Sequence, residues 1–251
     1  MEIVYIILFF IYGLLFGSFF NVVGLRVPIG ESIVHPPSHC TNCNRRLTAL
    51  DLVPVFSYLF LKGKCRRCGN RISPIYPIME LLTGVLFAFA YYQLGFTYEL
   101  IVGILFISLL VIITVSDFAY MLIPNKILFP FAILLAAGRF LSPLDPWWDS
   151  ITGAVFSFLL LLAIAVLSNG GMGGGDIKLF FVIGIVLGFI QSLLTLFFAA
   201  VIGAIAGIIV LKKTGKGKKT PVPFGPSIAA SAIIIYFYGQ EIVAWYAQLL
   251  N

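Results

Sequence analysis

Long apolar runs are the feature that most constrains the fold of this chain. Of its 251 residues, 61% are hydrophobic and only 10% are charged, whereas a soluble domain is about half apolar and a quarter charged. A helix that crosses a membrane needs roughly 20 apolar residues. Eight segments approach or reach this length: residues 3–24, 76–95, 100–116, 126–142, 150–168, 178–190, 192–211 and 226–249. The sequence therefore predicts an all-α polytopic membrane protein with about eight transmembrane helices.

The sixth of these segments is shorter than the others. Residues 178–211 are too long for one span, and Gln191 is predicted to divide them into a short piece and a full span. At about 1.5 Å per residue, the short piece cannot cross a hydrocarbon core of roughly 30 Å. We therefore expect Asp176, just before this piece, to lie slightly inside the membrane.

The basic residues predict how the helices are oriented, because Lys and Arg are enriched in short cytoplasmic loops near span ends. With the N-terminus outside, fifteen of the sixteen Lys and Arg residues fall on the inner side, mostly in residues 25–75 and 212–219. Arg139 is the exception and is expected to snorkel outward. The net charge of +6 is thus explained by topology and by contact with membrane lipid, and nucleic acid is not an expected partner.

Residues 25–75 are the one sizeable polar segment. They lie between the first helix, residues 1–24, and a seven-helix membrane core, residues 76–251, and they are predicted to be cytoplasmic. Two Cys-x-x-Cys turns place thiolates where together they complete a tetrahedral zinc site without an open position. Cytoplasmic thiols stay reduced, which makes disulfides the lesser alternative. We predict a small insertion scaffolded by structural Zn²⁺, with these ligands: Cys40, Cys43, Cys65 and Cys68.

Two lone aspartates lie at the ends of apolar runs that the predicted topology places on the same, cytoplasmic side. Asp117 precedes an Ile-Pro turn, and Asp176 follows three glycines, Gly173, Gly174 and Gly175. Carboxylates at the edge of a bilayer are costly and usually functional. One carboxylate of such a pair can accept a proton from water while its partner donates to a scissile carbonyl, and glycines let a substrate backbone approach. The pair predicts a membrane-embedded aspartyl protease.

Other interpretations explain part of this pattern. Either aspartate alone could cap a helix. A proton-coupled transporter would use paired acids as a relay, but it needs them near the midplane of the membrane. A non-catalytic zinc-bearing scaffold for pilus or secretion assembly would explain the cysteines but not the two acids. The glycine-rich loop does not follow a strand within a βαβ unit, so a nucleotide site is not indicated.

Taken in order and spacing, four motifs resemble the type IV prepilin peptidases, which belong to the intramembrane Gly-x-Gly-Asp aspartyl proteases. The motifs are Gly17-Ser18-Phe19-Phe20-Asn21-Val22-Val23, the paired Cys-x-x-Cys turns, Asp117 through Ile123-Pro124, and Gly173-Gly174-Gly175-Asp176-Ile177-Lys178. The resemblance covers nearly the whole chain and implies that Asp117 and Asp176 are the catalytic pair. It also implies removal of the short basic leader of type IV prepilins or pseudopilins after a glycine. The expected location is the cytoplasmic face of the bacterial inner membrane, with pilus or secretion assembly proteins as further partners.

The same resemblance implies a second activity, because such peptidases often also methylate the new amino terminus with S-adenosylmethionine. The sequence shows no recognisable motif for that cofactor. Residues 25–75 are the expected place for methyl transfer, since Gly63-Lys64 directly before Cys65 resembles the family's pattern. For Lys64 the alternative is a solvated surface charge. Glu80 is assigned to the substrate's amino group, with an ordinary interfacial helix residue as the alternative.

Overall fold

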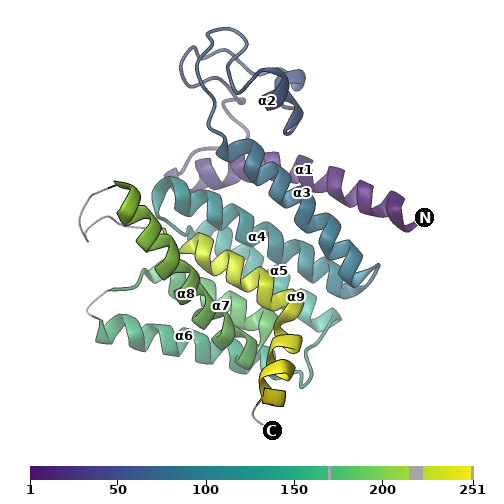
Figure 1. The fold of residues 1–251 in the computed structure, drawn as a ribbon, viewed down its shortest axis with the longest axis vertical. Coiled ribbons are helices and arrows are strands. Elements are labelled where there is room, and N and C mark those ends of the chain that lie inside the picture. The colour runs from purple at the N-terminus through teal and green to yellow at the C-terminus, as the bar shows by residue number, and fades with distance from the viewer. Residues whose placement is uncertain (169–170, 215–222, 250–251) are drawn as a thin grey trace. The chain divides into compact units, whose positions relative to one another are not determined.

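The computed structural model describes residues 1–168, 171–214 and 223–249, and most of these residues are helical (Figure 1). The chain divides into two compact units, Met1–Val115 and Ser116–Asn251, and α4 runs from the first into the second. Six of the described helices, α1, α3, α4, α6, α8 and α9, are long and apolar enough to cross a membrane. The helices are α1 Glu2–Arg26, α2 Phe56–Phe60, α3 Ile75–Leu94, α4 Tyr98–Tyr120, α5 Asn125–Leu141, α6 Asp149–Leu167, α7 Gly174–Leu187, α8 Phe189–Thr214 and α9 Gly225–Leu249.

The predicted fold class is confirmed, because each of the eight predicted helices is present with ends shifted by a few residues. The division of the sixth and seventh helices is corrected. The break lies at Gly188, which has a φ of 79°, whereas Gln191 lies inside α8. Glycine adopts this left-handed conformation without a steric penalty, and the carboxylate of Asp149 accepts the N–H of Phe189 at 3.1 Å to start α8.

In the first unit, α1 and α3 pack side by side (Figure 1). Their backbones touch at glycines, as is common between membrane helices. A Cβ atom at Gly13 would lie 2.6 Å from the carbonyl oxygen of Thr83, and one at Gly17 would lie 2.8 Å from the Cα of Glu80. The packing thereby brings the Gly17 motif of α1 against the start of α3.

In the second unit, the 14-residue helix α7 contacts α5, α6, α8 and α9. Eight of its side chains or glycines are buried, and Gly184 meets Gly153 of α6 so closely that a side chain at either would collide with the other backbone. A helix packed among other helices need not span the bilayer, because non-helical backbone at membrane depth is tolerated where protein surrounds it. This explains why α7 can be shorter than a full span.

The prediction that Arg139 snorkels outward is wrong. Only 9% of this residue is exposed, and its guanidinium donates to the carbonyl oxygen of Val186 from Nε at 3.1 Å and from Nη2 at 2.6 Å. The last carbonyls of a helix lack partners within the helix, and a cation there also interacts favourably with the helix dipole. Arg139 therefore caps α7 instead of facing solvent.

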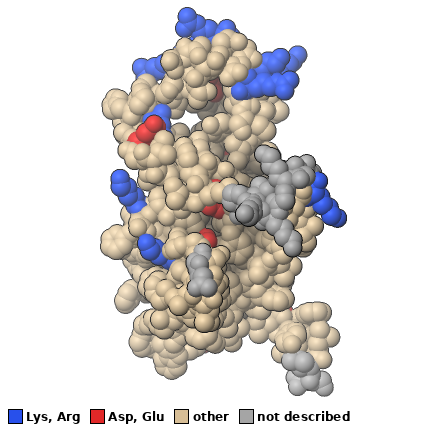
Figure 2. All heavy atoms as spheres, turned by 90° about the vertical axis from the view of Figure 1, so that its left-hand side faces the viewer, with Lys and Arg blue, Asp and Glu red and all other residues tan. Residues whose placement is uncertain are grey.

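Basic side chains gather over the segment between α1 and α3 (Figure 2). Residues 27–74 contain α2 and two short 3-10 turns, Val27–Ile29 and Ala49–Asp51, joined by loops. The Lys and Arg residues on which the predicted orientation depends therefore lie on the surface of this segment. The second basic cluster, residues 212–219, falls largely outside the described residues.

Candidate active site and metal site

The four cysteines come together as predicted. Their Sγ atoms all lie within 4.8 Å of one another, with Cys40 to Cys68 at 3.8 Å and Cys43 to Cys65 at 4.0 Å. A tetrahedron with Zn–S bonds of about 2.3 Å has sulfur–sulfur edges of about 3.8 Å. The cluster therefore fits one tetrahedral metal ion held by four thiolates.

The two cysteine turns have the same backbone pattern. The N–H of the first cysteine donates to a carbonyl five residues later, at 2.9 Å for Cys40 and 2.8 Å for Cys65. The residue after the second cysteine is left-handed in both turns, with a φ of 52° at Asn44 and 70° at Gly69. Asn and Gly tolerate this conformation better than other residues. Each half of the metal site is thus specified locally.

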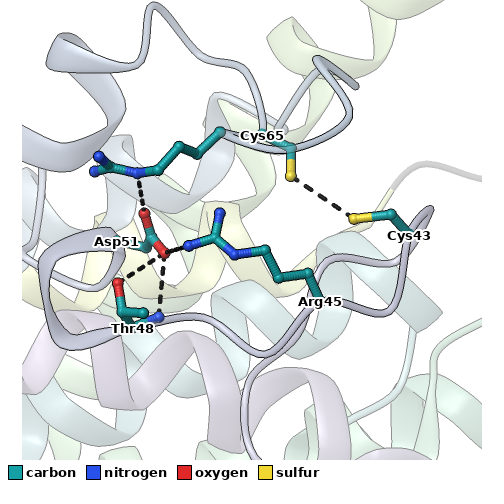
Figure 3. A network of polar contacts seen from close by, with 6 residues as sticks. Cys43, Arg45, Thr48, Asp51 and Cys65 are labelled. Atoms are coloured by element: carbon teal, nitrogen blue, oxygen red, sulfur yellow. Dashed lines mark hydrogen bonds and ion pairs between the residues drawn. The ribbon is translucent and has the colours of Figure 1, made fainter.

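Asp51 ties the two turns together (Figure 3). Its Oδ2 accepts hydrogen bonds from Arg45 at 2.8 Å and from the backbone N–H and hydroxyl of Thr48 at 3.1 and 2.9 Å, while its Oδ1 accepts from Arg66 at 2.9 Å. Burial raises the pKa of Asp51, but the hydrogen bonds from Thr48 and the two arginines outweigh it and leave this pKa below its usual range. Sequence reasoning missed Asp51, although it is the only acid between Glu31 and Glu80.

The thiols differ in how readily they ionise. The backbone N–H of Asn70 lowers the pKa of Cys68 to about 6, and that of Cys43 lowers the pKa of Cys40. The N–H of Arg45 favours the Cys43 thiolate, yet burial and the three neighbouring thiols raise its pKa to about 11. The metal-free cluster therefore retains protons, and a metal ion must displace them when it binds.

Gly63 and Lys64 both belong to the second cysteine turn. Gly63 has a φ of 68°, and a Cβ atom there would lie 2.8 Å from the Tyr58 hydroxyl. Its carbonyl accepts the N–H of Ile72 at 2.8 Å, and Lys64 forms an isolated bridge with Arg71. The turn itself thus explains both backbone positions, and a role toward a cofactor stays a prediction.

Glu80 is buried in α3, with 8% of the residue exposed. Its Oε2 accepts the N–H of Val55 at 2.7 Å, and Val55 has a φ of 62°, which is strained for a β-branched residue. On the facing helix α1, Asn21 donates to the carbonyl of Tyr76 at 3.2 Å. Its Oδ1 is buried and has no partner among the described residues. Glu80 therefore holds the polar segment onto α3, near a buried acceptor.

Asp117 lies in the last turn of α4 and is 6% exposed. Its Oδ2 accepts the N–H of Gly225, the first residue of α9, at 2.7 Å. The helix stops directly afterwards, since Met121 has a φ of 53° and donates its N–H to the carbonyl of Asp117 at 2.9 Å. The carboxylate is thus held between the end of one helix and the start of another.

Asp176 is the third residue of α7 and is half-buried. It does not occupy the N-cap position, which belongs to Gly173. A Cβ atom at Gly173 would lie 3.0 Å from Oδ2 of Asp176, and one at Gly175 would lie 2.8 Å from Ile123. These glycines let the carboxylate and the Ile-Pro turn approach the start of α7.

The two aspartates, far apart in sequence, are near enough for their charges to interact. Two further residues beside them were not assigned to the site from the sequence. Lys178 donates from Nζ to Oδ1 of Asn125 at 3.1 Å, which links the starts of α7 and α5. Asn125 begins the helix that follows Asp117, and Lys178 lies two residues after Asp176.

Comparison with known proteins identifies the family of this chain. Residues 11–94 match the profile of the bacterial peptidase A24 N-terminal domain, and residues 104–208 match that of the type IV leader peptidase family. A Bacillus subtilis protein named prepilin leader peptidase/N-methyltransferase is 47% identical over 96% of this chain and 97% of its own length. This chain belongs to the type IV leader peptidase family.

Family membership makes the chain a peptidase. Proteins from Aeromonas salmonicida and Pseudomonas putida, also named prepilin leader peptidase/N-methyltransferase, are 31% and 32% identical. These matches cover 98% and 95% of this chain, and 95% and 92% of the respective relatives. No solved structure matches the chain. The names of these relatives indicate that the peptidase is also an N-methyltransferase.

Proposed function

We propose that this protein is an intramembrane aspartyl endopeptidase that removes the short basic leader of type IV prepilins or pseudopilins after a glycine. The observation that carries the proposal is the pair Asp117 and Asp176, which lie at the ends of two helices in one unit, near enough for their charges to influence one another. One carboxylate accepts a proton from water, the resulting hydroxyl adds to the scissile carbonyl carbon, and the other carboxylic acid protonates the carbonyl oxygen. Collapse breaks the C–N bond, and the released amine takes up a proton.

The loop before Asp176 supports approach of a peptide backbone. Gly173 and Gly174 are exposed, and a Cβ atom at Gly174 would meet nothing within 4 Å. The absence of side chains leaves room for an extended strand beside the acid. A precursor with an apolar helix behind its cleavage site would keep that helix in the membrane and its basic leader in the cytoplasm.

The proposed orientation follows from the charges. We place the N-terminus outside and the aspartates at the cytoplasmic face of the bacterial inner membrane. The basic surface of residues 25–75 then faces the cytoplasm, as the positive-inside rule requires. In that reducing compartment the four-cysteine cluster holds Zn²⁺, which stabilises a segment too small to build a large core.

The second activity is N-methylation of the amino terminus released by cleavage. S-adenosylmethionine, when bound, supplies the methyl group. Two acceptors in the first unit suit the amine: the Glu80 carboxylate and Oδ1 of Asn21, a 4% exposed residue whose Oδ1 has no hydrogen-bond partner within the described part of the chain. They orient its N–H groups, and Glu80 takes the proton that leaves as the N–C bond forms. Gly63 and Lys64 remain the proposed contacts to the cofactor, although the fit is weaker there because the cysteine turn already occupies them.

Mass spectrometry of a purified prepilin tests the proposal. The precursor is incubated with the protein and S-adenosylmethionine, using wild type, Asp117→Asn and Asp176→Asn. Asp145→Asn is the matched control because this acid is exposed. Wild type and control should release the leader after glycine and add a methyl group, whereas the two site variants should do neither to the intact precursor.

The outcomes separate the alternatives. Normal cleavage by both site variants contradicts the aspartyl mechanism. If the precursor stays intact after incubation with folded, zinc-loaded wild-type protein, the alternative of a non-catalytic assembly scaffold is favoured. Glu80→Gln tests the second activity alone: a leader-free pilin peptide should be methylated more slowly while precursor cleavage persists.

A further inference from the structure

We infer that Gly225 is a positioning residue for peptide cleavage, which orients Asp117 through its backbone N–H. The inference rests on the proposed catalytic role of Asp117. Gly225 lies 108 residues beyond Asp117 and outside the segment that matches the peptidase profile.

The contact is short and buried. The N–H of Gly225 donates to Oδ2 of Asp117 at 2.7 Å, a length typical of a hydrogen bond to a charged acceptor. It comes from the first turn of α9, where backbone N–H groups lack partners within the helix and the helix dipole favours an anion. One oxygen of Asp117 is thereby fixed, and Oδ1 is left to act on water.

The residue must be glycine for reasons of space. A Cβ atom at this position would lie 2.8 Å from Oδ2 of Asp117 and 3.0 Å from its Cβ and Cγ. Gly225 is not among the residues with a positive φ, so its backbone conformation would suit other amino acids. The close approach of Asp117, and not the backbone conformation, therefore explains why this residue is glycine.

The start of α9 is itself held in place. The carbonyl of Phe224 accepts the N–H groups of Ser227 and Ile228 at 3.0 and 3.1 Å. The ring of Phe224 packs on Gly203 of α8, where a Cβ atom would lie 2.9 Å from it. Gly203 thus supports the placement of Gly225, and through it that of Asp117. Gly207, one turn further along α8, would meet nothing within 4 Å if it carried a Cβ.

The test compares three alanine variants of the full-length protein in detergent, with Asp117→Asn alongside. Gly225→Ala keeps the N–H but pushes the carboxylate away, and a misplacement of about 1 Å at a reacting group can cost about 100-fold in rate. We expect kcat for leader removal to fall by roughly 10- to 100-fold with KM unchanged. Gly203→Ala should give a smaller fall, and the matched control Gly207→Ala should leave kcat unchanged.

Methylation of a synthetic leader-free pilin peptide serves as the readout of folding. It should remain at the wild-type rate in Gly225→Ala, together with the zinc content. An unchanged kcat in Gly225→Ala, while Asp117→Asn is inactive, overturns this inference but is consistent with the proposed protease function. Loss of both activities with a lower melting temperature also overturns it, because Gly225 would then serve folding. Full cleavage by Asp117→Asn refutes the proposed function instead.

Discussion

Replacing Asp51 should weaken metal binding although Asp51 does not touch the metal. Its carboxylate joins Arg45, two residues after Cys43, to Arg66, next to Cys65. In Asp51→Ala the two cysteine turns lose this link. Because the metal stabilises the folded segment, free energy lost from the folded segment is also lost from metal affinity.

The magnitude follows from the exposure of each partner. The Asp51 side chain is 3% exposed, Arg45 is 22% exposed and Arg66 is 50% exposed. The half-exposed Arg66 contributes less than about 1 kcal/mol, whereas hydrogen bonds to the buried carboxylate contribute about 1.5–3 kcal/mol. The total for Asp51→Ala is about 3 kcal/mol, which corresponds to roughly 100-fold in zinc affinity. Asp51→Asn keeps one acceptor oxygen and should lose less.

Competition with a chromophoric chelator measures this affinity in purified protein at neutral pH. The lowered pKa of Asp51 means that its stabilising charge is fully present there and is lost only as the pH falls through that lowered value. Glu31→Ala is the control, since Glu31 is an exposed acid of the same segment. An affinity of Asp51→Ala equal to that of the control would refute the reasoning.

Three further perturbations have expected outcomes. Gly188→Ala should lower the melting temperature, because the left-handed φ costs about 1–3 kcal/mol and the new Cβ would collide with the carboxylate of Asp149; an unchanged melting curve contradicts the assigned break. Arg139→Met should destabilise the protein by about 1–3 kcal/mol, since the carbonyl of Val186 loses its donors; circular dichroism during heating measures this, and equal stability would argue against a cap. Removal of the metal with a strong chelator should make residues 25–75 sensitive to limited proteolysis while the membrane helices stay protected; unaltered digestion would show that the metal does not hold the segment.

Features that depend on composition over a window were predictable. A membrane helix requires an apolar run of fixed length, so the eight segments appear in the structure near their predicted bounds. The cysteine cluster was also predictable, because each pair of ligands lies on one local turn. A lone acid such as Asp176 at the edge of an apolar run is conspicuous for the same reason.

Features set by contacts between residues far apart in the sequence were not predictable. Gln191 interrupts the apolar run, but a polar side chain does not end a helix, whereas the left-handed Gly188 does. Arg139 finds its partners on another helix, which a sequence window does not reveal. The pairing of Gly225 with Asp117 spans 108 residues, and Asp51 lies between turns that meet only after folding.

The two partners of the hydrogen bond between Asp117 and Gly225 are synthesised at different times. A ribosome adds about 5–20 residues per second, so a nascent chain contains Asp117 for about ten seconds before its partner 108 residues later is made. During that interval the carboxylate lacks the amide that fixes it. Under the proposed mechanism, an insertion intermediate of this protein therefore lacks a correctly oriented Asp117 and cleaves slowly until α9 has been added.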